Sequence, residues 1–357
     1  MSREYLPFID WMKCAGITLI VVGHVAAAPI NDLTPPIYPK QLGVAFFMFI
    51  IGFSLARETR PVGRVLYNRL FEVYLYGLAI AALLSAVTFL SRGTLALSNY
   101  LPFLGGANVL FNNFPANPTT WYIGTYLHVL IIGAVVLRRV QVRLWMIAAV
   151  AVAEIAVRGM LVAYAGAYVG YMLVTNWATV LVAGAYFGQR AAGSTADTFT
   201  SRVWPWAAMA GLGVVWVLIV ENWVAARSFP FMHLSLDGRP APIDQGPVVD
   251  FLSSTLVTLL YSCWAILVFR ATRRLPTPSL VRFLARNTLI VFIAHMPVFY
   301  VVEAALKARG WSYGERSFVL VAVCLFGLAA VSEVIRSVAN PEPLRRRLLE
   351  RLATRQA

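Results

Sequence analysis

Residues 10–24 read DWMKCAGITLIVVGH, an apolar stretch that nevertheless carries a carboxylate, an ammonium group and an imidazole. Lys13 and His24 are eleven residues apart, which is about three turns of an α-helix at roughly 100° per residue. They therefore lie on nearly one face, separated by about 16 Å along the helix axis. Because a charged group inside a membrane helix costs about 2.5–3.5 kcal/mol, it usually marks a pathway or a site. The stretch predicts a membrane helix with a polar stripe.

The whole chain is too apolar for a soluble globular protein. Hydrophobic residues make up 59% of its 357 residues, charged residues make up 13%, and the mean hydropathy is +0.71. The net charge of +14 would suit a nucleic-acid partner, but the arginines fall in short clusters between apolar runs. That placement is typical of the cytoplasmic loops of a membrane protein. We therefore expect a lipid bilayer as the surroundings and no nucleic acid as a partner.

Ten apolar segments are long enough to cross a bilayer, given that about 20 residues are needed. This number predicts an all-α, polytopic integral membrane protein with about ten transmembrane helices. The first segment ends in Ala26-Ala27-Ala28, which resembles a signal-peptide cleavage site, but Asp10 and Lys13 at its start favour a retained helix. The segments lie at about 8–28, 38–56, 71–91, 119–137, 143–162, 167–188, 203–224, 249–270, 285–305 and 316–336.

The distribution of Lys and Arg predicts the orientation of these helices. With the N-terminus inside, twenty of these residues fall in the inner segments and the C-terminal tail, and eight fall in the outer segments. Lys40 and Arg158 are among the eight assigned to the outside. The excess of positive charge on the inner side predicts that both termini are cytoplasmic. Glu154 lies midway along the fifth segment and needs a partner there, which the sequence does not identify.

The predicted inner loop after the second segment is rich in arginine. It reads RETRPVGRVLYNR over residues 57–69 and holds Arg57, Arg60, Arg64 and Arg69. These arginines satisfy the positive-inside rule, but guanidinium groups also bind phosphate bidentately. Arg69 differs from the others because it directly precedes the apolar run of the third segment. The three cysteines, Cys14, Cys263 and Cys324, show no metal-binding spacing, and we expect no metal site.

Several motifs occur in order along the chain. Asp10, Lys13 and His24 form an acidic residue, a basic residue and, after ten others, a histidine. They are followed by FFMFIIGF at 46–53, NRLF at 68–71, WYI at 121–123 and ARNTL at 285–289, which leads to His295. In this ordered set the sequence resembles the membrane-bound acyltransferase family 3, the O-acyltransferases of bacterial surface glycans. It departs from the family pattern at Ile51, where serine is usual, and at Tyr126, where glutamate is frequent.

The resemblance implies a reaction and a location. The donor would be cytoplasmic acetyl-CoA or another short acyl-CoA, used as a substrate with no tightly bound cofactor. The acceptor would be a hydroxyl of an extracytoplasmic glycan, that is, an exopolysaccharide, a lipopolysaccharide or a glycolipid. The protein would be a multi-pass protein of the bacterial inner membrane. Residues 1–340 would form the acyltransferase domain, and residues 341–357 an Arg-rich cytoplasmic tail.

The same resemblance implies roles for individual residues. His24 would act as general base or accept the acyl group transiently, with Lys13 and Asp10 in the same catalytic set. Asn287 or His295 would stabilise the oxyanion that develops on the acyl carbonyl. Trp121 and Tyr122 would stack against a sugar. The donor phosphates would be held by Arg57, Arg60, Arg64 and Arg69.

Two other functions remain open from the sequence. Intramembrane charges and about ten helices suit a transporter or flippase for a glycan precursor or a small anion equally well. The sequence shows no repeated halves with paired interrupted segments, which many transporters have. A purely structural membrane subunit would leave the spacing of Lys13 and His24 without a purpose.

Overall fold

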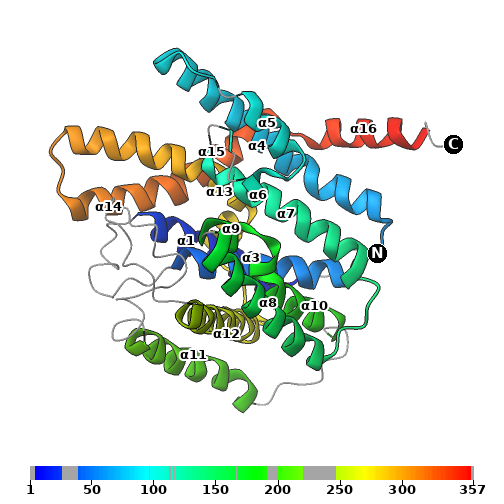
Figure 1. The fold of residues 1–357 in the computed structure, drawn as a ribbon. Helices are drawn as coiled ribbons and strands as arrows, with labels where there is room; N and C mark the ends of the chain where they lie inside the picture. The colour runs from blue at the N-terminus through cyan, green and yellow to red at the C-terminus, as the bar shows by residue number, and fades with distance from the viewer. Residues whose placement is uncertain are drawn as a thin grey trace.

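The fold was analysed in a computed structural model that describes residues 5–25, 39–95, 97–111, 114–115, 117–165, 167–190, 199–219 and 247–354. Every regular element within these residues is a helix, and no strand occurs among them. The prediction of an all-α fold is therefore confirmed. Each of the ten predicted segments coincides with one helix or with a short series of helices (Figure 1).

The long helices follow the order of the predicted segments. Three of the predicted segments contain a stretch that is not α-helical. These stretches are the π-helical turns η3 and η7 and the 3₁₀-helix η4. The elements are α1 (Pro7–His24), α3 (Pro39–Ala56), α4 (Val62–Arg92), α7 (Trp121–Ile132) with η3 (Gly133–Leu137), α8 (Leu144–Ala165), α9 (Ala167–Met172), η4 (Val174–Trp177), α10 (Ala178–Arg190), α11 (Phe199–Ile219), α12 (Pro247–Thr272), α13 (Ser279–Ala308), α14 (Tyr313–Ala322), η7 (Val323–Gly327) and α15 (Leu328–Val338).

Short helices occupy the predicted loop at 92–118, and one further helix follows α15. They are η1 (Leu97–Asn99), α5 (Tyr100–Leu104), α6 (Asn108–Phe111), η2 (Pro118–Thr120) and α16 (Glu342–Thr354). In Figure 1, α16 and the start of α4 lie at one end of the bundle, and the turn between α13 and α14 lies at the opposite end. We call these the α16 end and the α14 end.

Four helices of the described chain are long and apolar enough to cross a membrane. They are Val62–Arg92, Leu144–Leu161, Ser279–Ala308 and Gly314–Val338. Shorter apolar helices lie at Lys40–Ala56, Trp121–Leu137, Val203–Val214 and Thr258–Thr272. The protein is therefore a helical membrane protein, whereas the number of ten spans and the cytoplasmic placement of both termini stay predictions.

Glycines bring α3 into close contact with α10 and α1. A Cβ atom at Gly52 of α3 would collide with the backbone of Leu181 in α10, and one at Gly184 of α10 would collide with the backbone of Phe49. On the other side of α3, Gly43 faces Gly16 of α1. Small residues at such positions let helix backbones approach closely in a membrane. The packing fixes α3 between α10 and α1, and thereby fixes the face that α1 presents.

Arg158 is the partner of Glu154 that the sequence did not identify. It was counted on the outer side, at the end of the fifth segment, and it lies in α8 with its side chain fully buried, where it forms an ion pair with Glu154 one turn earlier. Its guanidinium also donates to Thr258 Oγ1 (2.8 Å) and to the carbonyl of Asn176 (2.8 Å). The second carboxylate oxygen of Glu154 accepts the N–H of Thr179 in α10 (2.6 Å). The i, i+4 spacing of Glu154 and Arg158 was the available sequence signal.

The start of α4 also differs from the expectation. α4 begins at Val62 rather than near residue 71, so that Arg64 and Arg69 lie within the helix and not in a loop. Arg64, Asn68 and Arg69 lower the hydropathy of residues 62–70, which still form helical turns after Pro61 at the N-cap. α3, by contrast, begins at Pro39, close to the predicted start at about residue 38, and Lys40, counted on the outer side, lies in its first turn.

Candidate functional site

The two histidines singled out from the sequence lie side by side, where the last turn of α1 meets α13. The Nε2 atom of His295 is 3.3 Å from Nδ1 of His24, and the ring centroids are 4.9 Å apart. Nδ1 of His24 is also 2.8 Å from the carbonyl oxygen of Ile20. His295 is almost fully buried. We call His24 and His295 the imidazole pair.

The hydrogen bonds of the imidazole pair determine where its protons lie. Nδ1 of His295 is 2.7 Å from the carbonyl oxygen of Phe292, which can only accept, so this nitrogen carries the proton. In neutral His295, Nε2 is then an acceptor. Nδ1–H of His24 therefore donates to the carbonyl of Ile20 and toward Nε2 of His295. These tautomers, inferred from the network, leave the lone pair of His24 on Nε2.

A proline two residues after His295 explains how the neighbouring elements are held. Pro297 lies inside α13 and lacks an N–H, so the carbonyl of Ile293, four residues earlier, loses its helical donor. Asn117 Nδ2 (2.8 Å) and Thr119 Oγ1 (3.0 Å) donate to this carbonyl instead. These bonds attach η2 to α13 and place the start of α7 beside the imidazole pair. The sequence had indicated no role for these residues, although Pro297 within an apolar segment was the available signal.

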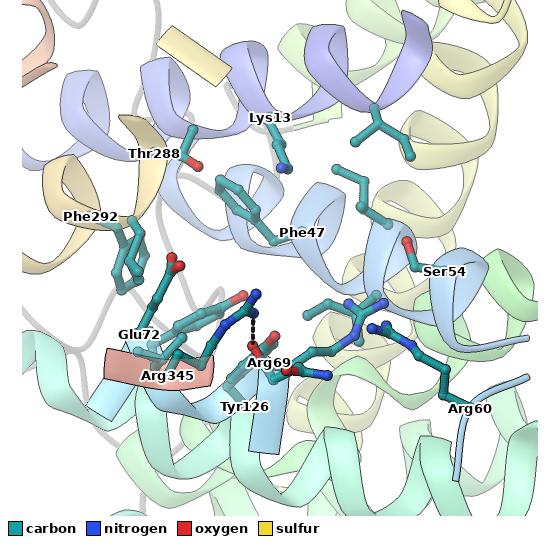
Figure 2. Close-up of a pocket in the computed structure, with 17 residues that line it drawn as sticks. Lys13, Phe47, Ser54, Arg60, Arg69, Glu72, Tyr126, Thr288, Phe292 and Arg345 are labelled. Carbon is teal, nitrogen blue, oxygen red and sulfur yellow. Dashed lines mark hydrogen bonds between the residues drawn. The ribbon is translucent and has the colours of Figure 1, made fainter. Parts of the chain in front are cut away.

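A cavity of about 660 Å³ lies between α1, α3, α4, α7, α13 and α16. Four cationic side chains line it, Lys13, Arg60, Arg69 and Arg345, and Glu72 is the one carboxylate among the described lining residues. Figure 2 shows Lys13 pointing into this space from α1, opposite Arg69 and Arg345. We call it the basic cavity. Its excess of cations fits an anionic ligand.

Two of the cations have donor groups that no described residue occupies, although Arg69 also forms a side-chain hydrogen bond with Tyr126. Nε of Arg69 is buried and has no hydrogen-bond partner among the described residues. The ammonium group of Lys13 makes no hydrogen bond within the described part of the chain, although Asp10 acts on it electrostatically. Arg60, by contrast, is engaged by Glu58 at 2.5 and 2.8 Å. Because a buried donor without a partner costs about 1–3 kcal/mol, Arg69 favours occupation of the cavity by an anion.

The other arginines of the predicted donor loop lie differently. Arg57 lines a smaller cavity of about 260 Å³, which shares Arg69 with the basic cavity, and its guanidinium lies 5.6 Å from the ring centroid of Phe53. Arg64 is exposed and lines neither cavity. The four arginines expected to act together are therefore divided, and only Arg60 and Arg69 face the basic cavity.

Asp10 and Asn287 are not brought to the imidazole pair. Asp10 Oδ2 accepts a hydrogen bond from the hydroxyl of Tyr5 (2.7 Å) near the start of α1. Asn287 Nδ2 donates to Glu333 Oε1 (2.6 Å) and to the carbonyl of Phe283 (2.8 Å). Asn287 precedes His295 by eight residues on α13, which is about 12 Å along the axis. The expected oxyanion role of Asn287 stays a prediction without support from proximity.

Phe292 connects the basic cavity with the imidazole pair. Tyr122 and Phe292 both line the cavity, and their ring centroids are 4.6 Å apart. The ring of Phe292 is in turn 6.0 Å from that of His295, centroid to centroid. Trp121 packs edge-on against Tyr122 at 5.8 Å. Tyr122 therefore faces the basic cavity, and sugar stacking by Trp121 and Tyr122 stays a prediction. No cluster of three metal ligands occurs among the described residues.

Apolar helices that enclose a basic cavity next to a histidine pair define a helical membrane protein with a site of the kind found in enzymes. Residues 6–335 match the family described as "Acyltransferase domain" (Acyl_transf_3). The chain therefore belongs to the acyltransferase family 3, as its motifs predicted, and is an acyltransferase. Comparisons with curated proteins and with solved structures found no match.

Proposed function

We propose that the protein is an O-acyltransferase that moves an acyl group from cytoplasmic acyl-CoA to a hydroxyl of an extracytoplasmic glycan. The observation that carries this proposal is the position of two sites along α1. Lys13 lines the basic cavity, and His24, about 16 Å further along the helix, belongs to the imidazole pair. One helix thus connects a site for an anion with a site for proton transfer.

The basic cavity is the proposed donor site. Acyl-CoA carries several phosphate groups, and charge-assisted hydrogen bonds to phosphate are stronger than neutral ones. Lys13, Arg60 and Arg69 supply positive charge to the cavity. The α16 end lies in the cytoplasm in this proposal, because the positive-inside rule assigns the residues around it to the inner side.

His24 is the proposed general base. Its Nε2 takes the proton of the acceptor hydroxyl while the hydroxyl oxygen attacks the thioester carbonyl. A C–O bond forms, the C–S bond breaks, and the proton passes from Nε2 to the departing thiolate. His295 positions the base, because its Nε2 accepts Nδ1–H of His24 and supports the imidazolium ion that forms. Lys13 contributes to donor binding rather than to proton transfer in this scheme.

The proposed acyl group is acetyl, and the proposed acceptor is a glycan of the cell envelope. Acetyl transfer to an exopolysaccharide, a lipopolysaccharide or a glycolipid at the outer face of a bacterial inner membrane fits the family. Trp121 and Tyr122, at the start of α7, would meet the acceptor near the imidazole pair. No residue of the described chain is proposed to hold a metal or a permanently bound cofactor.

Purified protein tests the function directly. We expect that incubation with acetyl-CoA labelled in the acetyl group, together with total cell-envelope glycan, yields glycan that carries label as a base-labile ester. Free coenzyme A should appear in equal amount. Vesicles that accumulate a labelled glycan precursor, with no label passing from acetyl-CoA to glycan, would instead support the transporter hypothesis and contradict the proposal.

A further inference from the structure

Helix α16 lies beyond the family match, yet it supplies a side chain to the basic cavity. The match ends at residue 335, and α16 spans Glu342–Thr354. In Figure 1 this helix lies at the same end of the bundle as the start of α4. Arg345 of α16 lines the cavity with Lys13 and Arg69, which come from α1 and α4 (Figure 2).

Arg345 is held in place by both its backbone and its side chain. The hydroxyl of Tyr67 in α4 donates to the carbonyl oxygen of Arg345 (3.0 Å), and Nη1 of Arg345 lies 3.5 Å from the carbonyl oxygen of Asn68. Its Nη2 pairs with Glu342 Oε2 at 2.5 Å. The α16 helix itself begins with Asn340 Oδ1 accepting the N–H of Glu342 (2.9 Å). A side chain fixed in this way is preorganised to meet a ligand.

The neighbouring arginines of α16 lie outside the cavity. The side chain of Arg345 is 24% exposed, that of Arg346 is 72% exposed, and Arg347 is also exposed. Glu342 pairs with Arg346 through Oε1 (2.8 Å) as well as with Arg345. One carboxylate shared between two guanidinium groups leaves a net positive charge at this end of the cavity. Of these three arginines, only Arg345 lines the cavity.

We infer that Arg345 is a donor-binding residue, which joins Lys13 and Arg69 in holding a phosphate group of the acyl-CoA donor. The segment after residue 340 is then part of the donor site and not only an Arg-rich tail. A guanidinium can bind phosphate through two parallel hydrogen bonds, which a lysine cannot do. This inference rests on the proposed function, because it concerns the ligand of the same cavity.

A pair of variants and a pair of donors test the role of Arg345. Arg345→Gln and Arg347→Gln remove the same charge from positions two residues apart on one helix, but only the first lies in the cavity. We expect Arg345→Gln to lower kcat/KM for acetyl-CoA about tenfold or more, chiefly through KM, as lost charge-assisted phosphate contacts predict. Arg347→Gln should stay within about twofold of wild type, as expected for an exposed charge. With the phosphate-free thioester S-acetyl-N-acetylcysteamine, both variants should match wild type.

Each other outcome overturns the inference in a recognisable way. Equal kinetics of the two variants with acetyl-CoA would assign α16 no part in donor binding. Equal losses of Arg345→Gln with both donors would show a general structural role. Losses of both variants that appear only in vesicles of anionic lipid would show that α16 binds lipid headgroup phosphates. If wild-type protein itself neither binds acetyl-CoA nor uses it, the proposed function fails first, which this design distinguishes from failure at Arg345.

Discussion

The proton on Nδ1 of His295 decides which chemistry is available at His24. Because Nδ1–H of His295 donates a hydrogen bond to the carbonyl oxygen of Phe292 (2.7 Å), Nε2 of neutral His295 can only accept one. It therefore favours the His24 tautomer that has its proton on Nδ1 and its lone pair on Nε2. A helix carbonyl, from Ile20, accepts the same Nδ1–H at 2.8 Å. Because both acceptors lie beside Nδ1 of His24, Nε2 on the opposite side of the imidazole ring is left as the base.

The arginines offer a test at the scale of one residue. Arg69→Ala removes a cavity cation whose Nε is buried without a partner, whereas Arg64→Ala removes the same charge from an exposed turn of the same helix. We expect Arg69→Ala to weaken acetyl-CoA binding by about tenfold or more, and Arg64→Ala to leave it within about twofold. Calorimetric titration of the purified variants measures both affinities. Equal affinities for wild type and Arg69→Ala would limit these arginines to membrane orientation.

For single residues, the sequence predicted which side chains belong to the site better than it predicted which side chains contact one another. The spacing of Lys13 and His24 was informative because helix geometry alone relates residues within one helix. His295 was expected to matter, but its contact with His24 joins residues 271 positions apart, and no local pattern reports such a distance. The donor arginines show the same limit, because helical turns point Arg64 and Arg69 in different directions.

Among the helices, α3 fixes the position of α1, which carries Lys13 and His24. It packs through glycines against α10 on one side and against α1 on the other. The close approach of α1 sets the direction in which Lys13 and His24 project. Gly52, which belongs to the motif at residues 46–53, therefore acts through packing and does not need to touch a substrate.

The α3–α10 contact predicts a difference between two glycine substitutions. Gly52→Ala places a Cβ against the backbone of Leu181, whereas Gly211→Ala in α11 places one in open space. We expect Gly52→Ala to destabilise the protein by about 1–3 kcal/mol through overpacking. Gly211→Ala should be neutral or stabilising by up to about 1 kcal/mol, because alanine favours a helix more than glycine does. Thermal unfolding in detergent compares the two, and equal midpoints would contradict the described packing.

The elements were predictable from hydropathy as far as their apolar centres reach. All ten predicted segments coincide with helices, because the apolar runs themselves are helical. The boundaries were less predictable, since polar turns such as Arg64–Arg69 extend α4 without raising hydropathy. The interruption between α9 and α10 at η4 was also missed, although the polar residues Thr175 and Asn176 lie within it.

For the whole molecule, the proposal depends on which end of the bundle faces the cytoplasm. Reporters fused after Arg139 or at the C-terminus should behave as cytoplasmic, and a reporter inserted near Gly105, in the turn after α5, should behave as external. The physical reason is the excess of Lys and Arg in the segments assigned to the inner side. Alkaline phosphatase and fluorescent-protein fusions measure the two locations. An external C-terminus would place the basic cavity on the side that lacks acyl-CoA.

The sequence predicted the class of protein, but it did not predict how the C-terminal helix packs against the rest of the chain. Composition and ordered motifs indicated a helical membrane acyltransferase, and the family match over residues 6–335 confirms this class. The division at residue 340 stays a prediction, although α16 contacts Tyr67 and Asn68 of α4. A tail that folds back onto the body leaves no signal in its own composition, since an Arg-rich helix suits a free cytoplasmic tail equally well.

The most direct test of the proposed mechanism replaces the base and measures transfer and donor binding in one preparation. Because glutamine is polar but cannot take up a proton, His24→Gln should lower the rate of acetyl transfer to glycan by about 10²–10⁴. The affinity for acetyl-CoA should stay within about twofold of wild type, since His24 does not line the basic cavity. His128→Gln, in the neighbouring helix α7, should leave both quantities near wild type and serves as the control. Transfer by His24→Gln at the wild-type rate would contradict the account.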